Sequence, residues 1–274
     1  MTHQSLVKPP LVMGIVNVTP DSFSDGGRHA SVEAAVAHGL TLIAQEADVL
    51  DVGGESTRPG SDPVDEAGEI ARVVPVIAAL RAQWSGPISI DTMKPAVARA
   101  AVAAGATMWN DVTALRHAPD SLSTAAELGC EVVLMHMKGA PKTMQDDPRY
   151  DDVVAEVAAF LNARTEAAMA AGVARGRIWL DPGIGFAKTT AHNLRLTAQL
   201  DAVVDLGFPV LYAASRKRLI QGVDETATQS DDRLGGSLAL ALEGARRGAR
   251  MVRVHDVRET VQALKLQTAV GAAH

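Results

Sequence analysis

Short apolar runs that end in a polar or charged residue recur eight times along the chain. Runs of this length, rich in Val, Ile and Leu, suit strands that are buried on both faces of a parallel sheet. A polar residue at the end of such a strand costs free energy unless a partner meets it there. The runs end at Asn17, Glu55, Asp91, the pair Asn110 and Asp111, His136, Asp181, Ser215 and His255.

Ala-rich segments with helical spacing separate these runs. Ser31 precedes the first segment, Pro95 suits the first turn of the third, and Asp256 is positioned to cap the last. Strands that alternate with helices at this pitch predict parallel pairing, and eight repeats predict an α/β fold, a single (β/α)8 TIM barrel. The helical segments cover residues 31–46, 65–82, 95–104, 119–128, 150–171, 190–204, 231–248 and 256–269.

Two connections that follow strands are long and rich in Gly, Pro, Asp and Ser, namely Thr19–Arg28 and Ser56–Pro63. Active sites of such barrels lie at the C-terminal ends of the strands, so long loops there are candidate lids that exclude water. The alternative is a pair of solvated insertions. Phe23 and Arg58 favour lids, because they are unusual residues for idle loop tips.

Length and composition fit one domain. With 274 residues and 47% apolar content, the chain suits a barrel of about 250 residues, and no linker-like boundary divides it. We expect the barrel to cover residues 11–269, between an N-terminal extension, 1–10, and a C-terminal tail, 270–274.

Charge and composition exclude several classes of partner. The net charge of −6 argues against a general nucleic-acid or anionic-membrane surface. No uncharged apolar stretch reaches membrane-spanning length, and the N-terminus lacks the apolar core of a signal peptide. Cys130 is the only cysteine, so no internal disulfide can form. Together these features predict a cytoplasmic protein that binds neither nucleic acid nor membrane.

The alternation of side chains along a strand indicates which strand-end residues share a face. If the terminal residues point inward, five of them converge on one cavity, and three more lie on the same rim. One interpretation is a ring of mutually paired core residues. So many polar groups together favour a binding site instead. The inward set is Asp91, Asn110, Asp181, Arg253 and His255, and the rim set is Asn17, Ser215 and Lys217.

The acidic and amide members of this set suit a planar heterocycle. Asp91, Asn110 and Asp181 present acceptors and one amide donor. A carboxylate can accept two parallel N–H bonds from an amidine-like edge, and an Asn can recognise a neighbouring N–H and C=O pair.

The basic members suit phosphate or carboxylate oxygens, and they are Arg58, Lys217, Arg253 and His255. A guanidinium inside an apolar strand requires an anion, so Arg253 is the most informative of them. Asp256 or another core carboxylate is one candidate for that anion, and we favour a bound anionic substrate.

Three further features are weaker. Backbone N–H groups of Ser215–Lys217 are expected to form an anion site, as is common after the seventh strand of a barrel. The glycines of Asp181–Phe186 allow close approach of the backbone to a ligand. His136 has no neighbour at metal-ligand spacing, so a zinc site is not expected.

The ordered set of motifs resembles the dihydropteroate synthase family. Matches run from about residue 11 to residue 267, and the ordered set is far more specific than any single motif. The matching segments are Met13–Gly27, Asp51–Gly60, Ser89–Pro95, Asn110–Val112, Leu134–Gln145, Leu180–Thr189, Ala214–Lys217 and Arg253–Val257.

The resemblance implies a barrel enzyme that condenses 6-hydroxymethyl-7,8-dihydropterin diphosphate with p-aminobenzoate, releasing pyrophosphate and forming 7,8-dihydropteroate. It also implies a homodimer. The family's pterin pocket falls on Asp91, Asn110, Asp181 and Lys217. Its diphosphate side falls on Thr57, Arg58, Arg253 and His255, with Asn17 as the protein ligand of Mg²⁺. Its p-aminobenzoate side falls on Phe186, Ser215 and Lys217, with the two lids around Phe23 and Pro59 above it, and its catalytic groups fall on Asp91, Lys217, Arg253 and His255.

Two other functions fit parts of the pattern. A pterin-binding methyltransferase domain shares the barrel and the acidic contacts, but it needs neither the loop after Asn17 nor the segments at Ser215 and Arg253. A pterin-binding paralogue without activity is expected to have damaged lids or basic residues, and this sequence has intact ones.

Overall fold

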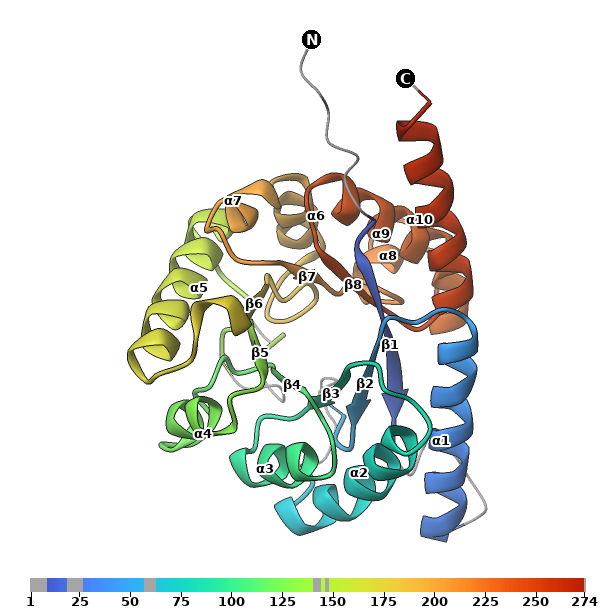
Figure 1. Cartoon of the computed structure of the whole chain (residues 1–274). Helices are drawn as coiled ribbons and strands as arrows, with labels where there is room; N and C mark the ends of the chain where they lie inside the picture. The colour runs from blue at the N-terminus through green and yellow to red at the C-terminus, as the bar shows by residue number, and fades with distance from the viewer. Residues whose placement is uncertain (1–8, 19–26, 57–62, 140–143, 146–147, 274) are drawn as a thin grey trace.

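The computed structural model describes residues 9–18, 27–56, 63–139, 144–145 and 148–273. Eight parallel strands lie side by side in the order β6-β5-β4-β3-β2-β1-β8-β7, and a bridge between Leu180 and Val210 links the two ends of the sheet. Figure 1 shows the resulting ring of strands inside a ring of helices, which confirms the predicted (β/α)8 barrel. The strands are β1 (Leu11–Asn17), β2 (Val49–Gly53), β3 (Ile88–Asp91), β4 (Met108–Asp111), β5 (Glu131–Met135), β6 (Ile178–Asp181), β7 (Leu211–Tyr212) and β8 (Met251–Val254).

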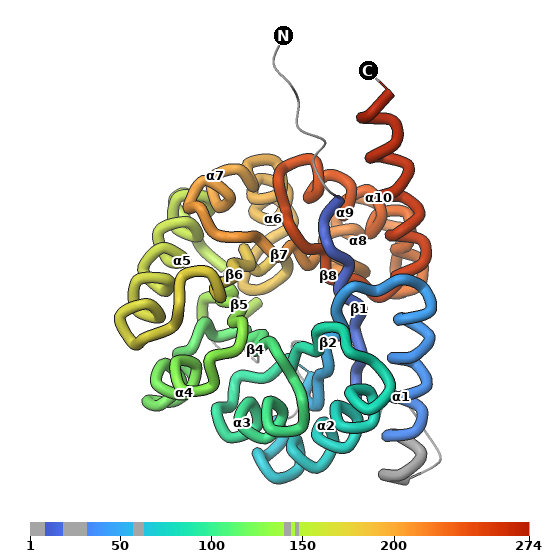
Figure 2. The backbone as a smooth tube through the Cα atoms, viewed as in Figure 1, coloured from blue at the N-terminus to red at the C-terminus, as the bar shows by residue number. Residues whose placement is uncertain are grey.

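Helices follow the strands in chain order, and the tube in Figure 2 traces this alternation around the barrel. The predicted segment 190–204 forms two helices rather than one. The helices are α1 (Gly27–Ala44), α2 (Glu66–Arg81), α3 (Pro95–Ala103), α4 (Ser121–Leu128), α5 (Val153–Ala170), α6 (Thr190–Ala198), α7 (Asp201–Val204), α8 (Arg218–Gln221), α9 (Leu234–Arg246) and α10 (Val257–Gly271), with short 3-10 turns at Arg175–Arg177 and Ser230–Arg233.

The predicted helix starts have mixed outcomes. Pro95 is the first residue of α3, where its missing N–H group and fixed φ angle suit the first turn. The prediction that α1 starts after Ser31 is wrong, because α1 begins at Gly27. Asp256 stands at the N-cap position of α10, but its side chain makes no capping bond and instead binds the guanidinium of Arg216. An ion pair with a charged partner therefore replaces the expected cap.

Side-chain parity divides the core into two compartments, as the alternation predicts. Inside the barrel, one layer of apolar side chains comes from seven of the strands. Between barrel and helices lies a second and larger cluster, which includes Trp109 and Tyr212. The inner layer is Met13, Val49, Met108, Val133, Trp179, Leu211 and Met251. On four of these strands the residue two positions further toward the C-terminal mouth is polar, namely Asp51, Asn110, Asp181 and Arg253.

The two long loops lie mostly outside the described residues, so the prediction that they are lids stays a prediction. Among the described helices, none combines the length and the apolar character needed to cross a membrane.

Candidate active site

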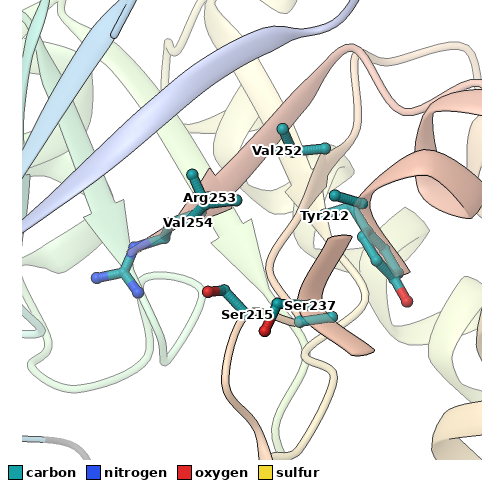
Figure 3. A pocket seen from close by; sticks show the side chains of 8 residues that line it. Tyr212, Ser215, Ser237, Val252, Arg253 and Val254 are labelled. Atoms are coloured by element: carbon teal, nitrogen blue, oxygen red, sulfur yellow. The ribbon is translucent and has the colours of Figure 1, made fainter. Parts of the chain in front are cut away.

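An ion cluster occupies the C-terminal mouth of the barrel. Arg253 on β8 donates from Nε to Oδ2 of Asp51 at 2.5 Å and from Nη2 to Oδ2 of Asp91 at 2.8 Å. Asn110 on β4 also donates to Oδ2 of Asp51, at 3.1 Å. Figure 3 shows the Arg253 side chain leaving β8 on the side opposite to Val252. One guanidinium therefore joins carboxylates from two other strands inside the barrel.

This cluster contains two carboxylates, Asp51 and Asp91, and one guanidinium, that of Arg253. Burial raises the pKa of Asp91 to about 7, repulsion from Asp51 adds to the shift, and Arg253 partly opposes it. Burial also opposes the charge of Arg253, but the two carboxylates outweigh it and raise its pKa. Oδ1 of Asp51 and Oδ1 of Asp91 are buried, and neither has a hydrogen-bond partner among the described residues. Buried acceptors without partners are costly, and they are what a ligand with N–H groups would satisfy.

Asp51 was not among the predicted site residues, although the strand pattern held a clue to it. It lies on β2 two residues after Val49, whose side chain belongs to the inner layer. The same alternation that directed Asp91 inward therefore applies to Asp51. The structure also identifies the anions that Arg253 contacts, which are Asp51 and Asp91 rather than Asp256.

The end of β6 and the turn after it form a second part of the mouth. Asp181 is buried, and its Oδ1 accepts from the backbone N–H of Gly183 at 2.7 Å. Burial raises the pKa of Asp181, while the Lys217 ammonium pulls it down. Nζ of Lys217 donates to the carbonyl oxygen of Ile184 and lies 4.6 Å from the centre of the Phe186 ring. Three predicted site residues, Asp181 at the end of β6 and Phe186 and Lys217 in loops, are thus brought together.

The surroundings of Lys217 disfavour its protonated, charged form. Burial lowers the pKa of Lys217 to about 8, and the nearby Asp181 partly offsets this. A lysine with such a pKa keeps most of its charge at neutral pH, so it suits an anionic or electron-rich ligand.

Ser215 and His255 form a linked pair at the ends of β7 and β8. Oγ of Ser215 lies 3.0 Å from Nδ1 of His255 and accepts from the backbone N–H of His255 at 3.2 Å. Ser215 also borders a narrow gap toward Ser237 and Tyr212 that is too tight for a water molecule (Figure 3). The pair is therefore anchored by its own hydrogen bonds on the rim of the mouth.

Two of the three backbone N–H groups in the predicted Ser215–Lys217 anion site have partners within the protein. The N–H of Arg216 donates to Oγ of Ser237 at 2.9 Å, and the N–H of Lys217 donates to the Ala214 carbonyl. Both donors are already used within the protein.

Glu55 and Asp111, two other strand-end acids, have structural partners. Glu55 and Glu69 both bind the ammonium of Lys94, and Glu55 also accepts from the N–H of Val64. Asp111 points away from Asn110 and accepts from backbone and hydroxyl donors in the turn after β4. Neither carboxylate faces the cluster around Arg253.

Asn17, the predicted Mg²⁺ ligand, is the exposed last residue of β1. It offers one amide oxygen. No group of three His, Cys, Asp or Glu side chains suited to a metal occurs within the ranges that the structure describes. Mg²⁺ is commonly held by one or two protein oxygens, with water and substrate phosphates completing its shell. Asn17 fits that kind of site and does not fit a closed protein cage.

Four predicted residues cannot be placed. Thr57, Arg58 and Pro59, as well as Phe23 of the first loop, lie outside the described residues. Their assignments to the diphosphate side and to the lids stay predictions.

Comparison with known proteins identifies the family. The model of the pterin binding enzyme family matches residues 13–255. Dihydropteroate synthase from Escherichia coli K12 is 46% identical over 264 residues, which cover 96% of this chain and 93% of that protein.

Two solved structures are similar over nearly the whole chain. Dihydropteroate synthase from Xanthomonas albilineans with 4-aminobenzoic acid is 54% identical, with a TM-score of 0.91 and coverage of 97% of this chain and 94% of that one. The same enzyme in complex with 7,8-dihydropteroate is 51% identical, with a TM-score of 0.88 and coverage of 98% and 95%. Together with the barrel and its mouth, these matches define a pterin-binding enzyme. The chain belongs to the dihydropteroate synthase family.

Proposed function

We propose that this chain joins 6-hydroxymethyl-7,8-dihydropterin diphosphate to p-aminobenzoate, forming 7,8-dihydropteroate and pyrophosphate. The observation that carries the proposal is the pair of unpartnered carboxylate oxygens, on Asp51 and Asp91, beside the guanidinium of Arg253. An acceptor-rich pocket next to a fixed cation suits a heterocycle with N–H groups that carries an anionic substituent. Family membership supports the same substrates, since relatives bind 4-aminobenzoic acid and 7,8-dihydropteroate.

The pterin is assigned to the acidic half of the mouth. Asp91 and Asp181 would accept from ring N–H groups, and the Asn110 amide would add an adjacent donor and acceptor. Lys217 lies beside Asp181 and would donate to a ring acceptor. Binding in this half orients the methylene carbon of the substrate toward the rim.

The diphosphate is assigned to the basic half, with Arg253 on β8, His255 directly after β8, and the predicted Thr57 and Arg58. Arg253 would exchange carboxylate contacts for phosphate contacts, which its planar fork suits. Asn17 would hold Mg²⁺, which when bound supplies positive charge to the leaving diphosphate.

The arylamine is assigned to the space near Phe186, Ser215 and Lys217. The Phe186 ring offers an apolar surface, and the Lys217 ammonium is the nearest cation for the carboxylate of p-aminobenzoate. The amine would then face the methylene carbon of the bound pterin.

We infer that diphosphate departure precedes, or runs ahead of, attack by the arylamine. The dihydropterin ring can delocalise the positive charge that develops on the methylene group, and the Asp91 carboxylate would stabilise it. Positional isotope exchange in the diphosphate substrate without p-aminobenzoate tests this order. Exchange is expected, and its absence while the substrate turns over normally would contradict a free cation.

Product formation tests the proposed function. Purified protein is incubated with the pterin diphosphate, p-aminobenzoate and Mg²⁺, and both dihydropteroate and pyrophosphate are measured. Equal amounts of the two products are expected. Tight pterin binding without either product would overturn the synthase activity and favour a binding paralogue.

A homodimer and a cytoplasmic location stay predictions. Leu266 and Val270 on α10 are 65% and 58% exposed and lie one helical turn apart, so they are apolar surface that a second copy would cover. Light scattering on the purified protein measures the oligomeric state.

A further inference from the structure

Lys188, in the loop between β6 and α6, is a buried lysine that the proposed reaction does not use. Burial lowers its pKa to about 7, and the charge of Asp181 partly offsets this shift. Lys188 is 3% exposed. Its Nζ donates to the carbonyl oxygens of Gly183 and Phe186, both at 3.0 Å, and lies 3.4 Å from the carbonyl oxygen of His136. It also lies 2.9 Å from Nδ1 of the His136 ring. Three carbonyl oxygens and one ring nitrogen therefore surround Nζ of Lys188.

An uncharged His136 ring forms one side of the group of polar atoms around Nζ of Lys188, which we call the Lys188 cage. Burial, followed by repulsion from Lys188, lowers the pKa of His136 to about 2. The ring is therefore uncharged, and its Nδ1 shares a hydrogen bond with Nζ of Lys188. The ring is itself fixed by an edge contact with Phe160, at 4.9 Å between centroids. His136, a strand-end residue without metal-ligand neighbours, therefore has Lys188 as its hydrogen-bond partner.

The loop around the Lys188 cage has three residues at positive φ, a conformation that most residues avoid. Gly183 has a φ of +69°, and a Cβ atom there would lie 1.9 Å from the His136 carbonyl oxygen. Gly185 has a φ of +83°, and even Ala187 has a φ of +50°. Residues in this region of φ cost free energy unless surrounding contacts hold them. The ammonium of Lys188 supplies such contacts from inside the turn.

The same turn carries groups of the candidate active site. The Ile184 carbonyl accepts from Lys217, and the Phe186 ring lies over the Lys217 ammonium. The outer side of the turn has separate supports. Asn193 binds the N–H of Gly185 at 2.7 Å, and Tyr150 binds the Ala187 carbonyl at 2.9 Å. Loss of Lys188 should therefore loosen the turn without unfolding the barrel.

We propose that Lys188 is a positioning residue, whose caged ammonium holds the Gly183–Phe186 turn so that Ile184 and Phe186 fix Lys217 for the arylamine. This inference rests on the proposed function, because it assigns the arylamine to the Phe186 and Lys217 side. Lys188 acts through the turn and needs no contact with either substrate. Phe186 is assigned to the arylamine alone, whereas Asp91 and Asn110 hold the pterin from outside the turn. Removal of Lys188 should therefore affect the arylamine more than the pterin.

Steady-state kinetics on Lys188→Met test the proposal. Methionine keeps nearly the length of the side chain but donates to none of the carbonyl oxygens. The KM for p-aminobenzoate should rise by about tenfold or more, as expected when a charged hydrogen-bond donor is lost. The dissociation constant of the pterin diphosphate, measured by calorimetry, should change much less. Hydrogen exchange of the peptide that contains residues 181–188 should become faster, and this readout does not depend on activity.

Two variants of His136 give a second test in case Lys188→Met fails to fold. His136→Asn keeps a hydrogen-bonding group near the position of Nδ1, whereas His136→Leu removes it. The KM for p-aminobenzoate should rise in His136→Leu and stay near the wild-type value in His136→Asn. Lys265→Met serves as the control, since Lys265 is an exposed lysine on α10 that binds Glu46. It should leave both substrates unaffected.

The outcomes separate the positioning role from the proposed function. Wild-type protein that forms no dihydropteroate would overturn the proposed function, whatever the hydrogen exchange of the variants shows. Active wild-type protein, with a Lys188→Met variant that keeps its KM for p-aminobenzoate or loses affinity for both substrates equally, would overturn the positioning role. Equal values for His136→Leu and His136→Asn would also contradict it.

Discussion

Arg253 binds two carboxylates at once, and this changes what its removal would do. Replacement by Ala would leave Asp51 and Asp91 buried without their cation, and the pKa of Asp91 is already raised to about 7. Asp91 would then bind a proton more readily and lose its negative charge. An Ala variant would therefore disturb the pterin side as well as the diphosphate side. Arg253→Lys keeps the charge and removes only the planar fork.

Asp91→Asn should change how stability depends on pH. The pKa of Asp91 is about 7 in the folded chain against a usual value of 3.8, so the folded chain binds this proton more tightly. Wild-type stability contributed by this proton is lost as pH rises from about 4 to about 7, and Asn has no proton to lose. The free energy of unfolding of Asp91→Asn relative to wild type should therefore increase over this range. Urea unfolding at a series of pH values measures it.

The exposed acid Asp205 provides the control for this measurement. Asp205→Asn should differ from wild type by a nearly constant amount. If Asp91→Asn shows the same constant difference, the environment described for Asp91 is wrong.

Asp181→Ala should weaken pterin binding strongly. The substitution leaves a ligand N–H edge without an acceptor in a buried site, which costs about 1–3 kcal/mol. The dissociation constant of the free pterin should rise by about tenfold or more, as calorimetry would show. Unchanged affinity would remove Asp181 from the pterin half.

At the scale of elements, local patterns predicted much of the barrel and missed the contacts between side chains that are far apart in the sequence. The alternation of apolar residues identified the strands, and parity placed Asp91 and Asn110 on one face, where they are register partners on β3 and β4. The pairing of Arg253 with Asp51 joins residues 202 positions apart, so no local pattern specifies it. Asp256 is a second example. Its local position predicts a helix cap, but its carboxylate binds Arg216, which lies 40 positions away in the sequence.

The turn after β6 has a backbone that requires glycine at position 183. Gly183→Ala would place a Cβ atom 1.9 Å from the His136 carbonyl at a φ of +69°. It should lower the free energy of unfolding by about 1–3 kcal/mol or more and reduce activity, because the turn must move. Denaturant unfolding measures this change. Gly176→Ala is the matched control, since a Cβ there meets nothing within 4 Å. Similar stability of the two variants would contradict the described turn.

At the scale of the whole molecule, the inner apolar layer supports the mouth without taking part in it. Leu211→Ala should destabilise the protein by about 2–5 kcal/mol, because Leu211 is fully buried in that layer. Thermal unfolding measures the loss, and both KM values should stay near wild type at low temperature. Val223→Ala, at a position that is 66% exposed, should change little. A Leu211→Ala variant of normal stability would mean that the layer is not packed as described.

The division of the mouth into a pterin half and a diphosphate half is tested most directly by the affinity of Arg253→Lys for two ligands. Calorimetry would compare free pterin with pterin diphosphate, for the variant and for wild type. The variant should bind the diphosphate about tenfold more weakly, since it lacks the planar fork, and should bind the free pterin as wild type does. Equal losses for both ligands, or a loss for the free pterin alone, would contradict the division.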